Sequence, residues 1–205
     1  MFGALFAIAI GLFGIGVGVS QNKKAGGDTF GPFQFFGPFQ PKDKLLIAAQ
    51  PILSLIRQHE SRHNYNIIYG GQTRPLTSWN VARVLEFQQS LRTQGAASSA
   101  VGAYQFIYVT LNRLVSKMGI SRSATFSQSL QDKLALELLK ERGLEAYVSG
   151  RMSRAQFMLN IAKEWASFPR DGSGLSYYHG DGLNKALVSP RVVENTLNRA
   201  RSAYA

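Results

Sequence analysis

The chain has 205 residues, of which 45% are hydrophobic, enough for one folded domain and a tail. It contains no cysteine, so disulfides and thiolate metal ligands are excluded. With 23 Lys and Arg against 12 Asp and Glu, the formal net charge is +11, which favours polyanionic partners. The basic residues are spread along the chain without a nucleic-acid-binding signature, so we expect no specific nucleic-acid partner.

The first twenty residues, MFGALFAIAIGLFGIGVGVS, contain no charged side chain and are long enough to span a bilayer. Five glycines weaken a conventional spanning helix, and no basic residue precedes the apolar run as in a secretory signal. Lys23 and Lys24 follow it and favour holding the downstream chain on the cytoplasmic side. Two interpretations stay open for residues 1–20: a membrane-spanning segment, and a tail buried in an assembly.

Residues 21–44 are expected to form a linker rich in phenylalanine, glycine and proline. The sequence FGPFQ at 30–34 recurs at 36–40, and each Gly-Pro pair interrupts helices and strands alike. Five of the 13 phenylalanines lie within residues 30–40. This aromatic density is consistent with docking on a partner or membrane interface, and equally with folding back on the domain that follows.

From residue 45 to residue 205 the sequence predicts one mainly α-helical domain. Gly119 and Gly143 are placed to follow helices, Ser127 to precede one, and Ser189 with Pro190 to begin the last. Helical spacing of apolar residues occurs at 45–60, 79–93, 104–118, 127–142, 153–167 and 190–203.

One small β element is expected near the first helix. Residues 64–78 mix β-branched and aromatic side chains with Asn, Gly-Gly and Pro, a composition typical of a short β-ribbon. Within the first helix, Pro51 either kinks the helix or opens a second one. The helix that ends near residue 60 places Glu60 at its C-terminal end, facing this ribbon.

Residues 59–63 read HESRH and match the zinc-peptidase signature H-E-x-x-H. Two histidines four residues apart ligate one metal only when they share a continuous helical face, and a third ligand is needed. Poor helix formers follow His63, Asn66 stands where the metzincin extension needs glycine, and Glu86 has no acid beside it to support ligation. We therefore expect no metal and no cofactor, with a zinc peptidase as the alternative.

A buried glutamate at a helix end can stay protonated near neutral pH, as the donation of a proton to a glycosidic oxygen requires. Three segments carry a resemblance consistent with this: HESRHNYNIIYGG, SSAVGAYQFIYVTL at 98–111, and EWASFP at 164–169. In order and approximate spacing they resemble phage muramidases of the lysozyme-like superfamily, of the lambda-endolysin type. The resemblance covers roughly residues 50–180 and implies an α+β lysozyme-like fold.

The resemblance implies roles for particular residues. Glu60 matches the catalytic acid, and Ser61 matches the Glu-Ser pair common in lytic transglycosylases. Tyr104 and Gln105 match the G-x-Y-Q segment that lines the sugar cleft, where a flat ring and an amide suit a pyranose and its N-acetyl group. The alternative for both is a packed helix N-terminus. Trp165, in the EWASFP helix, is interpreted as a core residue.

The aromatic loop SYYHGDGLNKAL at 176–187 supplies weaker candidates for the rim of the cleft, Tyr177, Tyr178 and Asp181. The family tends to carry an acid soon after the Gly-Gly pair, whereas this chain reads LTSWN there. A retaining or inverting glycosidase needs a second carboxylate. Without one nearby, we expect a single-acid lytic transglycosylase that forms a 1,6-anhydro product, with hydrolysis by water as the close alternative. A two-carboxylate mechanism stays open if Glu86 is folded into the site.

The implied substrate is the β-1,4 bond between N-acetylmuramic acid and N-acetylglucosamine in the glycan strands of peptidoglycan. We expect a virion-associated enzyme, in the tail or inside the particle, that opens the periplasmic wall during genome delivery. Its further partners are then other virion proteins and, through residues 1–20, the bacterial membrane. The alternatives are a membrane-tethered endolysin for host lysis and a non-enzymatic virion protein that keeps a lysozyme-like fold.

Overall fold

The structure is a computed structural model that describes residues 41–182 and 184–205. The apolar segment expected at 1–20 and most of the linker expected at 21–44 lie outside these residues. None of the described helices combines the length and the apolar character that crossing a bilayer requires.

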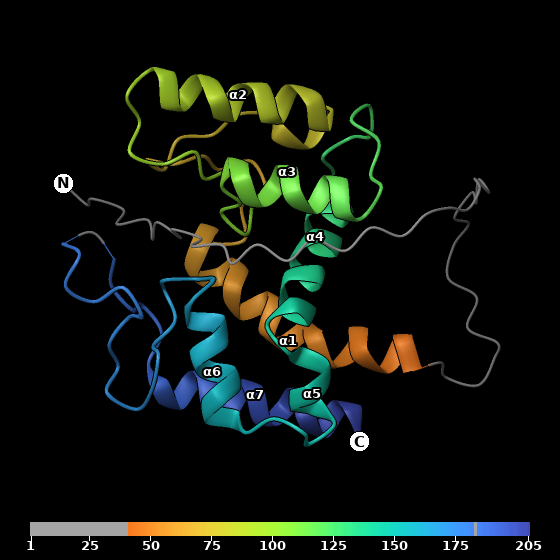
Figure 1. The fold of residues 1–205 in the computed structure, drawn as a ribbon, viewed down its shortest axis with the longest axis vertical. Coiled ribbons are helices and arrows are strands. Elements are labelled where there is room, and N and C mark those ends of the chain that lie inside the picture. Colours follow the sequence, from red (N-terminus) through yellow and green to blue (C-terminus); the bar gives the residue numbers. More distant parts are fainter. Residues whose placement is uncertain (1–40, 183) are drawn as a thin grey trace.

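The described residues form a mainly α fold, as the sequence predicts. α2 and α3 lie together at one end of the molecule, α1, α5, α6 and α7 gather at the other, and α4 runs between them (Figure 1). The elements are α1 (Pro41–Ser61), the 3-10 helix η1 (Leu76–Ser78), α2 (Val81–Thr93), α3 (Tyr108–Lys117), α4 (Gln128–Glu141), α5 (Leu144–Val148), α6 (Arg154–Ala162) and α7 (Pro190–Tyr204).

The ends of several helices follow the chemistry expected of them. The Ser127 hydroxyl accepts the N–H of Leu130 at the start of α4, and Pro190 occupies the first turn of α7. Gly143 follows α4 with a left-handed φ of 99°. α1 continues through Pro51 as one helix, so Pro51 does not open a second one. The sequence misses α5, a five-residue helix too short for a periodic pattern.

Two expected helices are shorter than the sequence predicts. The helix expected at 104–118 begins only at Tyr108, because residues 101–106 form a tight turn closed by a bridge between Val101 and Phe106. Gln105 lies in this turn with a left-handed φ of 52°, which a helix excludes. The helix expected at 153–167 ends at Ala162, so EWASFP is a turn and not a helix.

The β-ribbon expected at 64–78 is reduced in the described residues to isolated bridges. Ile67 pairs with Thr73, and Ile68 pairs with Val101. The second bridge joins the segment after α1 to the turn at 101–106, whose last three residues the sequence assigns to a helix. This small β element therefore brings together two of the three motif segments.

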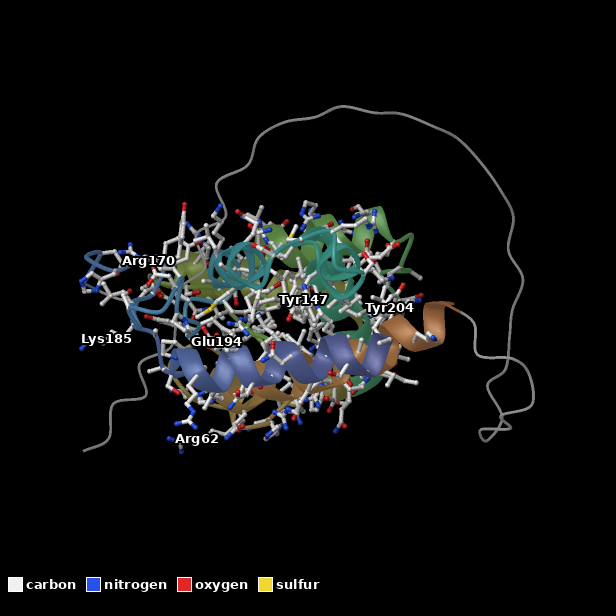
Figure 2. All side chains as sticks on the ribbon, turned by 90° about the horizontal axis from the view of Figure 1, so that it is seen from below. Arg62, Tyr147, Arg170, Lys185, Glu194 and Tyr204 are labelled. Atoms are coloured by element: carbon white, nitrogen blue, oxygen red, sulfur yellow. The ribbon has the colours of Figure 1, made fainter. Side chains whose placement is uncertain are left out.

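The core lies between α1, α7 and the helices that cross them. Figure 2 shows α7 lying alongside α1, with Tyr147 close to α7. Tyr147 is fully buried and stacks on Phe157 with ring centroids 4.8 Å apart. Its carbonyl accepts two bonds from the Arg201 guanidinium, which ties the C-terminal helix to α5. α7 in turn packs against α1.

The turn at 101–106 gives a prediction about stability. Gly102 has a left-handed φ of 75°, and a Cβ there would collide with the Gln131 amide, whereas Gly95 has φ of 83° and open space around it. We expect Gly95→Ala to lower the free energy of unfolding by about 1 kcal/mol through the backbone alone. Gly102→Ala should lower it by at least about 1 kcal/mol more, because the Gln131 amide must move. Urea unfolding of both variants measures this, and equal losses would contradict it.

Candidate active site

Glu60 lies on the buried face of α1. Its apolar neighbours on that face, Ile52 and Ile56, precede it at steps of four residues and are fully buried. The same periodicity carries the Glu60 side chain into the interior, where only 3% of the residue is exposed. The sequence pattern that makes α1 amphipathic therefore also buries the Glu60 side chain.

Ser167, from the turn at 163–169, provides the hydrogen bonds to this carboxyl. Its hydroxyl donates to Glu60 Oε1 at 2.5 Å, and its backbone N–H also donates to the carboxyl. Burial raises the pKa of Glu60 to about 7 from an ordinary value of 4.5, and the two bonds from Ser167 act in the opposite direction. At neutral pH the carboxyl is therefore close to half protonated.

The two histidines of the H-E-x-x-H match do not share a helical face. α1 ends at Ser61, and both Arg62 and His63 have left-handed φ values, of 53° and 62°. The N–H of His63 bonds to the carbonyl of Arg57 at 3.0 Å, six residues earlier, where the chain turns out of the helix. His63 is exposed as a result, and the described residues contain no group of three side chains suited to holding a metal.

His59 does not counteract the raised pKa of Glu60. It is partly buried, and this burial lowers its own pKa below the ordinary value of 6.5. His59 is therefore neutral at neutral pH, and it adds no positive charge that would favour the ionised carboxylate.

Hydrogen bonds join the three motif segments into one site. Trp165 donates from its indole nitrogen to the carbonyl of Tyr104 at 3.2 Å, which fixes the turn at 163–169 against the turn at 101–106. The Tyr104 hydroxyl accepts from Arg57, on α1, at 2.6 Å. Trp165 is 3% exposed and belongs to the core, as expected. Glu60, Gln105 and Ser167 therefore come from segments that are bonded to one another.

Tyr104 and Ser61 lie in the interior with their hydroxyls engaged. Tyr104 is 1% exposed, and its hydroxyl also donates to Asp132 at 2.6 Å. Ser61 is 2% exposed and donates to the carbonyl of Arg57 at 2.9 Å. For Tyr104 this geometry favours the packing alternative over a ring that faces a sugar. Both residues support the end of α1 from inside.

Gln105 is the residue of this turn with free acceptor capacity. It is 6% exposed, and its Nε2 donates to the carbonyl of Gly102 at 2.9 Å, while its Oε1 has no partner. A left-handed φ in a residue other than glycine is strained, and such strain clusters at functional sites. Gln88 also has an unpartnered Oε1, but it lies in a regular helix and is completely buried.

Tyr178 and Asp181 help to hold the loop that follows the turn at 163–169. The Tyr178 hydroxyl donates to the carbonyl of Lys163 at 2.6 Å. The Asp181 carboxylate accepts from the backbone N–H of Asn184 at 2.8 Å and from its side chain. Next to them, Tyr177 is 42% exposed and packs edge-to-face on Tyr178. This loop therefore presents one aromatic face to solvent.

Three other carboxylates are paired with arginine or exposed on the surface. Asp132 pairs with Arg57 at 3.3 Å, and Glu164 pairs with Arg142 at 2.5 Å. Glu86 is exposed on the surface of α2. Among the described residues no carboxylate contributes to the pKa of Glu60, which depends on burial and on Ser167.

Sequence reasoning missed Ser167. The segment EWASFP was read as a structural helix, and within it only Trp165 was assigned a role. The sole signal was the position of a serine inside a segment that resembled a family motif. No local pattern links Ser167 to Glu60, because the two residues are 107 positions apart.

Residues 46–189 of the chain match the family described as Endolysin. The endolysin of Escherichia phage lambda is 28% identical over 127 residues, covering 62% of this chain and 75% of that protein. A solved structure of bacteriophage lambda lysozyme complexed with a chitohexasaccharide aligns at 20% identity with a TM-score of 0.41, covering 82% of this chain and 97% of the other.

The family match spans more than half of the chain and all three segments of the site. The protein is therefore a peptidoglycan-degrading phage enzyme. It belongs to the endolysin family.

The raised pKa of Glu60 predicts a pH-dependent loss of stability. Folding favours the protonated carboxyl, so this contribution is complete below about pH 4.5 and is lost as the pH rises through about 7. The isosteric variant Glu60→Gln has no such loss. Its advantage in free energy of unfolding over the natural chain should grow by up to about 3 kcal/mol between pH 4.5 and 8. Urea unfolding across this range measures the difference, and a constant difference would refute the raised pKa.

Proposed function

We propose that Glu60 is the general acid and base of a muramidase that cleaves the β-1,4 bond between N-acetylmuramic acid and N-acetylglucosamine. The observation that supports this most directly is a carboxyl buried at a helix end with a pKa of about 7. A group with a pKa near the working pH is present in both protonation states, so it can donate a proton and later accept one.

In the proposed reaction, protonated Glu60 gives its proton to the glycosidic oxygen as the bond from that oxygen to C1 of N-acetylmuramic acid breaks. The N-acetylglucosamine leaves with a new hydroxyl, and positive charge develops at C1. The ionised Glu60 then accepts the proton of the C6 hydroxyl while that oxygen bonds to C1. The products are a 1,6-anhydro-muramic acid end and a regenerated acid, and water in place of the C6 hydroxyl would give hydrolysis.

The occupancy of the other carboxylates supports the single-acid scheme. A retaining mechanism places a second carboxylate about 5 Å from the first, and an inverting one places a base across the sugar. Asp132 and Glu164 are each paired with an arginine, and Glu86 is exposed on α2. We therefore propose a lytic transglycosylase, with the attacking hydroxyl supplied by the substrate itself.

Gln105 is the proposed contact to the glycan. Its unpartnered Oε1 can accept a hydrogen bond from an N-acetyl N–H or a sugar hydroxyl, and its turn is bonded to the segment that carries Ser167. The exposed ring of Tyr177, supported by Tyr178, offers a flat face for a pyranose at the rim. Tyr104 and Ser61 are hydrogen-bonded to Arg57, on the helix that carries Glu60. Asp181 accepts two hydrogen bonds from Asn184 within the rim loop.

The biological setting is a separate proposal. The sequence led us to expect a virion-associated enzyme for genome delivery, held by residues 1–20 in the particle or in a membrane. Membership of the endolysin family favours host lysis instead, and the chain's lambda relative bears the same name. We propose the lysis setting. Mass spectrometry of purified phage particles that finds this chain as a stoichiometric component would overturn it in favour of the virion setting.

Glu60→Gln is expected to abolish wall cleavage while the variant stays folded, because the amide has the shape of the acid without its proton. Turbidity loss of purified cell walls measures the activity, and circular dichroism verifies the fold. The matched control is Glu86→Gln, which neutralises an exposed carboxylate on α2 and should keep full activity. Cleavage by folded Glu60→Gln would end the assignment, and inactive Glu86→Gln would restore a two-carboxylate mechanism.

The products of digestion are expected to carry 1,6-anhydro-muramic acid ends. Mass spectrometry of the released muropeptides distinguishes these from reducing ends, which differ by one water and indicate hydrolysis. Cut peptide stems that disappear on addition of a chelator would instead support the zinc-peptidase alternative. No cleavage of any kind by the folded full chain would support the non-enzymatic alternative.

A further inference from the structure

Ser167 contacts the carboxyl of Glu60 in a way that singles out one oxygen. Its hydroxyl lies 2.5 Å from Oε1, and both residues are buried, with Ser167 at 0% exposed. A hydroxyl that donates to one carboxyl oxygen distinguishes that oxygen from the other. The two oxygens of Glu60 are therefore not equivalent, since Oε1 is engaged by the protein.

The position of Ser167 does not depend on Glu60. Its carbonyl accepts the N–H of Leu187 at 2.7 Å and that of Val188 at 3.2 Å, which anchors it to the segment leading into α7. Two residues earlier, Trp165 is bonded to the turn at 101–106. The Ser167 hydroxyl is therefore presented by a turn fixed on both sides, and Glu60 meets a donor that is already in place.

We propose that Ser167 is the positioning residue of Glu60, holding Oε1 and leaving Oε2 to carry the proton that passes to the glycosidic oxygen. This inference rests on the proposed role of Glu60 as the general acid. A donor bonded to Oε1 makes that oxygen the weaker site for a proton, so the acidic proton resides on Oε2. After the transfer, the same hydroxyl stabilises the carboxylate until Oε2 takes up a proton again.

The described charged groups near Glu60 do not take this role in place of Ser167. On α1, Arg57 is neutralised by an ion pair with α4, and His59 is neutral near pH 7 because burial lowers its pKa. On the segment that carries Ser167, Glu164 is paired with the arginine at the end of α4. Removal of the Ser167 hydroxyl should therefore raise the pKa of Glu60 further, since its bond is one of the two groups opposing burial.

The test compares Ser167→Ala with Ser176→Ala in the full chain. Ser176 is 2% exposed and also donates through its hydroxyl, but to the carbonyl of Ala166 at 2.9 Å, so this control removes an equally buried bond that does not reach Glu60. The first readout is the pH profile of kcat/KM for wall cleavage. The second is the titration of the Glu60 side-chain carboxyl by carbon NMR, assigned as the resonance missing in Glu60→Gln.

We expect Ser167→Ala to move both the high-pH limb of the profile and the carboxyl titration upward by roughly one pH unit, with a lower maximal rate. Ser176→Ala should leave both unmoved, whatever it does to stability. Ser167→Cys keeps a weaker donor of similar size, so its shift should be smaller than that of Ser167→Ala. If Ser167→Ala does not fold, Ser167→Cys takes its place in the test. An unmoved limb and titration in a folded Ser167 variant would overturn the proposal. Activity in Glu60→Gln would instead overturn the function on which it rests.

Discussion

The Glu60 carboxyl leaves water when the apolar face of α1 packs into the core, and the chemistry of the site depends on this desolvation. An ionised carboxylate in such a place is unfavourable unless donors compensate for the lost water. The turn at 163–169 provides that compensation from a distant part of the chain, through Ser167. Partial compensation leaves the pKa at about 7, between that of an exposed glutamate and that of an unsatisfied buried one.

The way α1 ends determines which neighbours Glu60 has. Arg62 and His63 follow the helix, and both have left-handed φ values. A left-handed φ in a residue other than glycine costs about 1 to 2 kcal/mol. Backbone bonds to the last turn of α1 offset part of that strain. The reversal directs Arg62 to the edge of the molecule (Figure 2) and leaves His63 exposed. An H-E-x-x-H match therefore becomes a single buried acid, because the helix ends before the second histidine.

The sequence predicted the features that depend on local periodicity and capping. Steps of four residues placed Glu60 on the buried face at the end of a helix, and serine caps and glycines located several helix ends. Contacts made over long distances in the chain could not be predicted in this way. The Tyr104 hydroxyl is taken by Asp132 and Arg57, 28 and 47 residues away, so a ring expected to face a sugar lies in the core. Ser167 went unnoticed for the same reason, and short motifs read as helices proved to be turns.

The strong positive charge of the chain acts to lower the pKa of Glu60, yet this pKa is raised. Local ion pairs explain the difference. A net charge of +11 favours ionised carboxylates, and Arg57 lies one helical turn before Glu60 on α1. Asp132 and Tyr104 hold its guanidinium, so its charge is balanced locally. The surface can then attract an anionic wall without lowering the pKa of the buried acid. In the proposed mechanism, one carboxyl near its pKa serves first as acid and then as base, so the reaction would need no second acid.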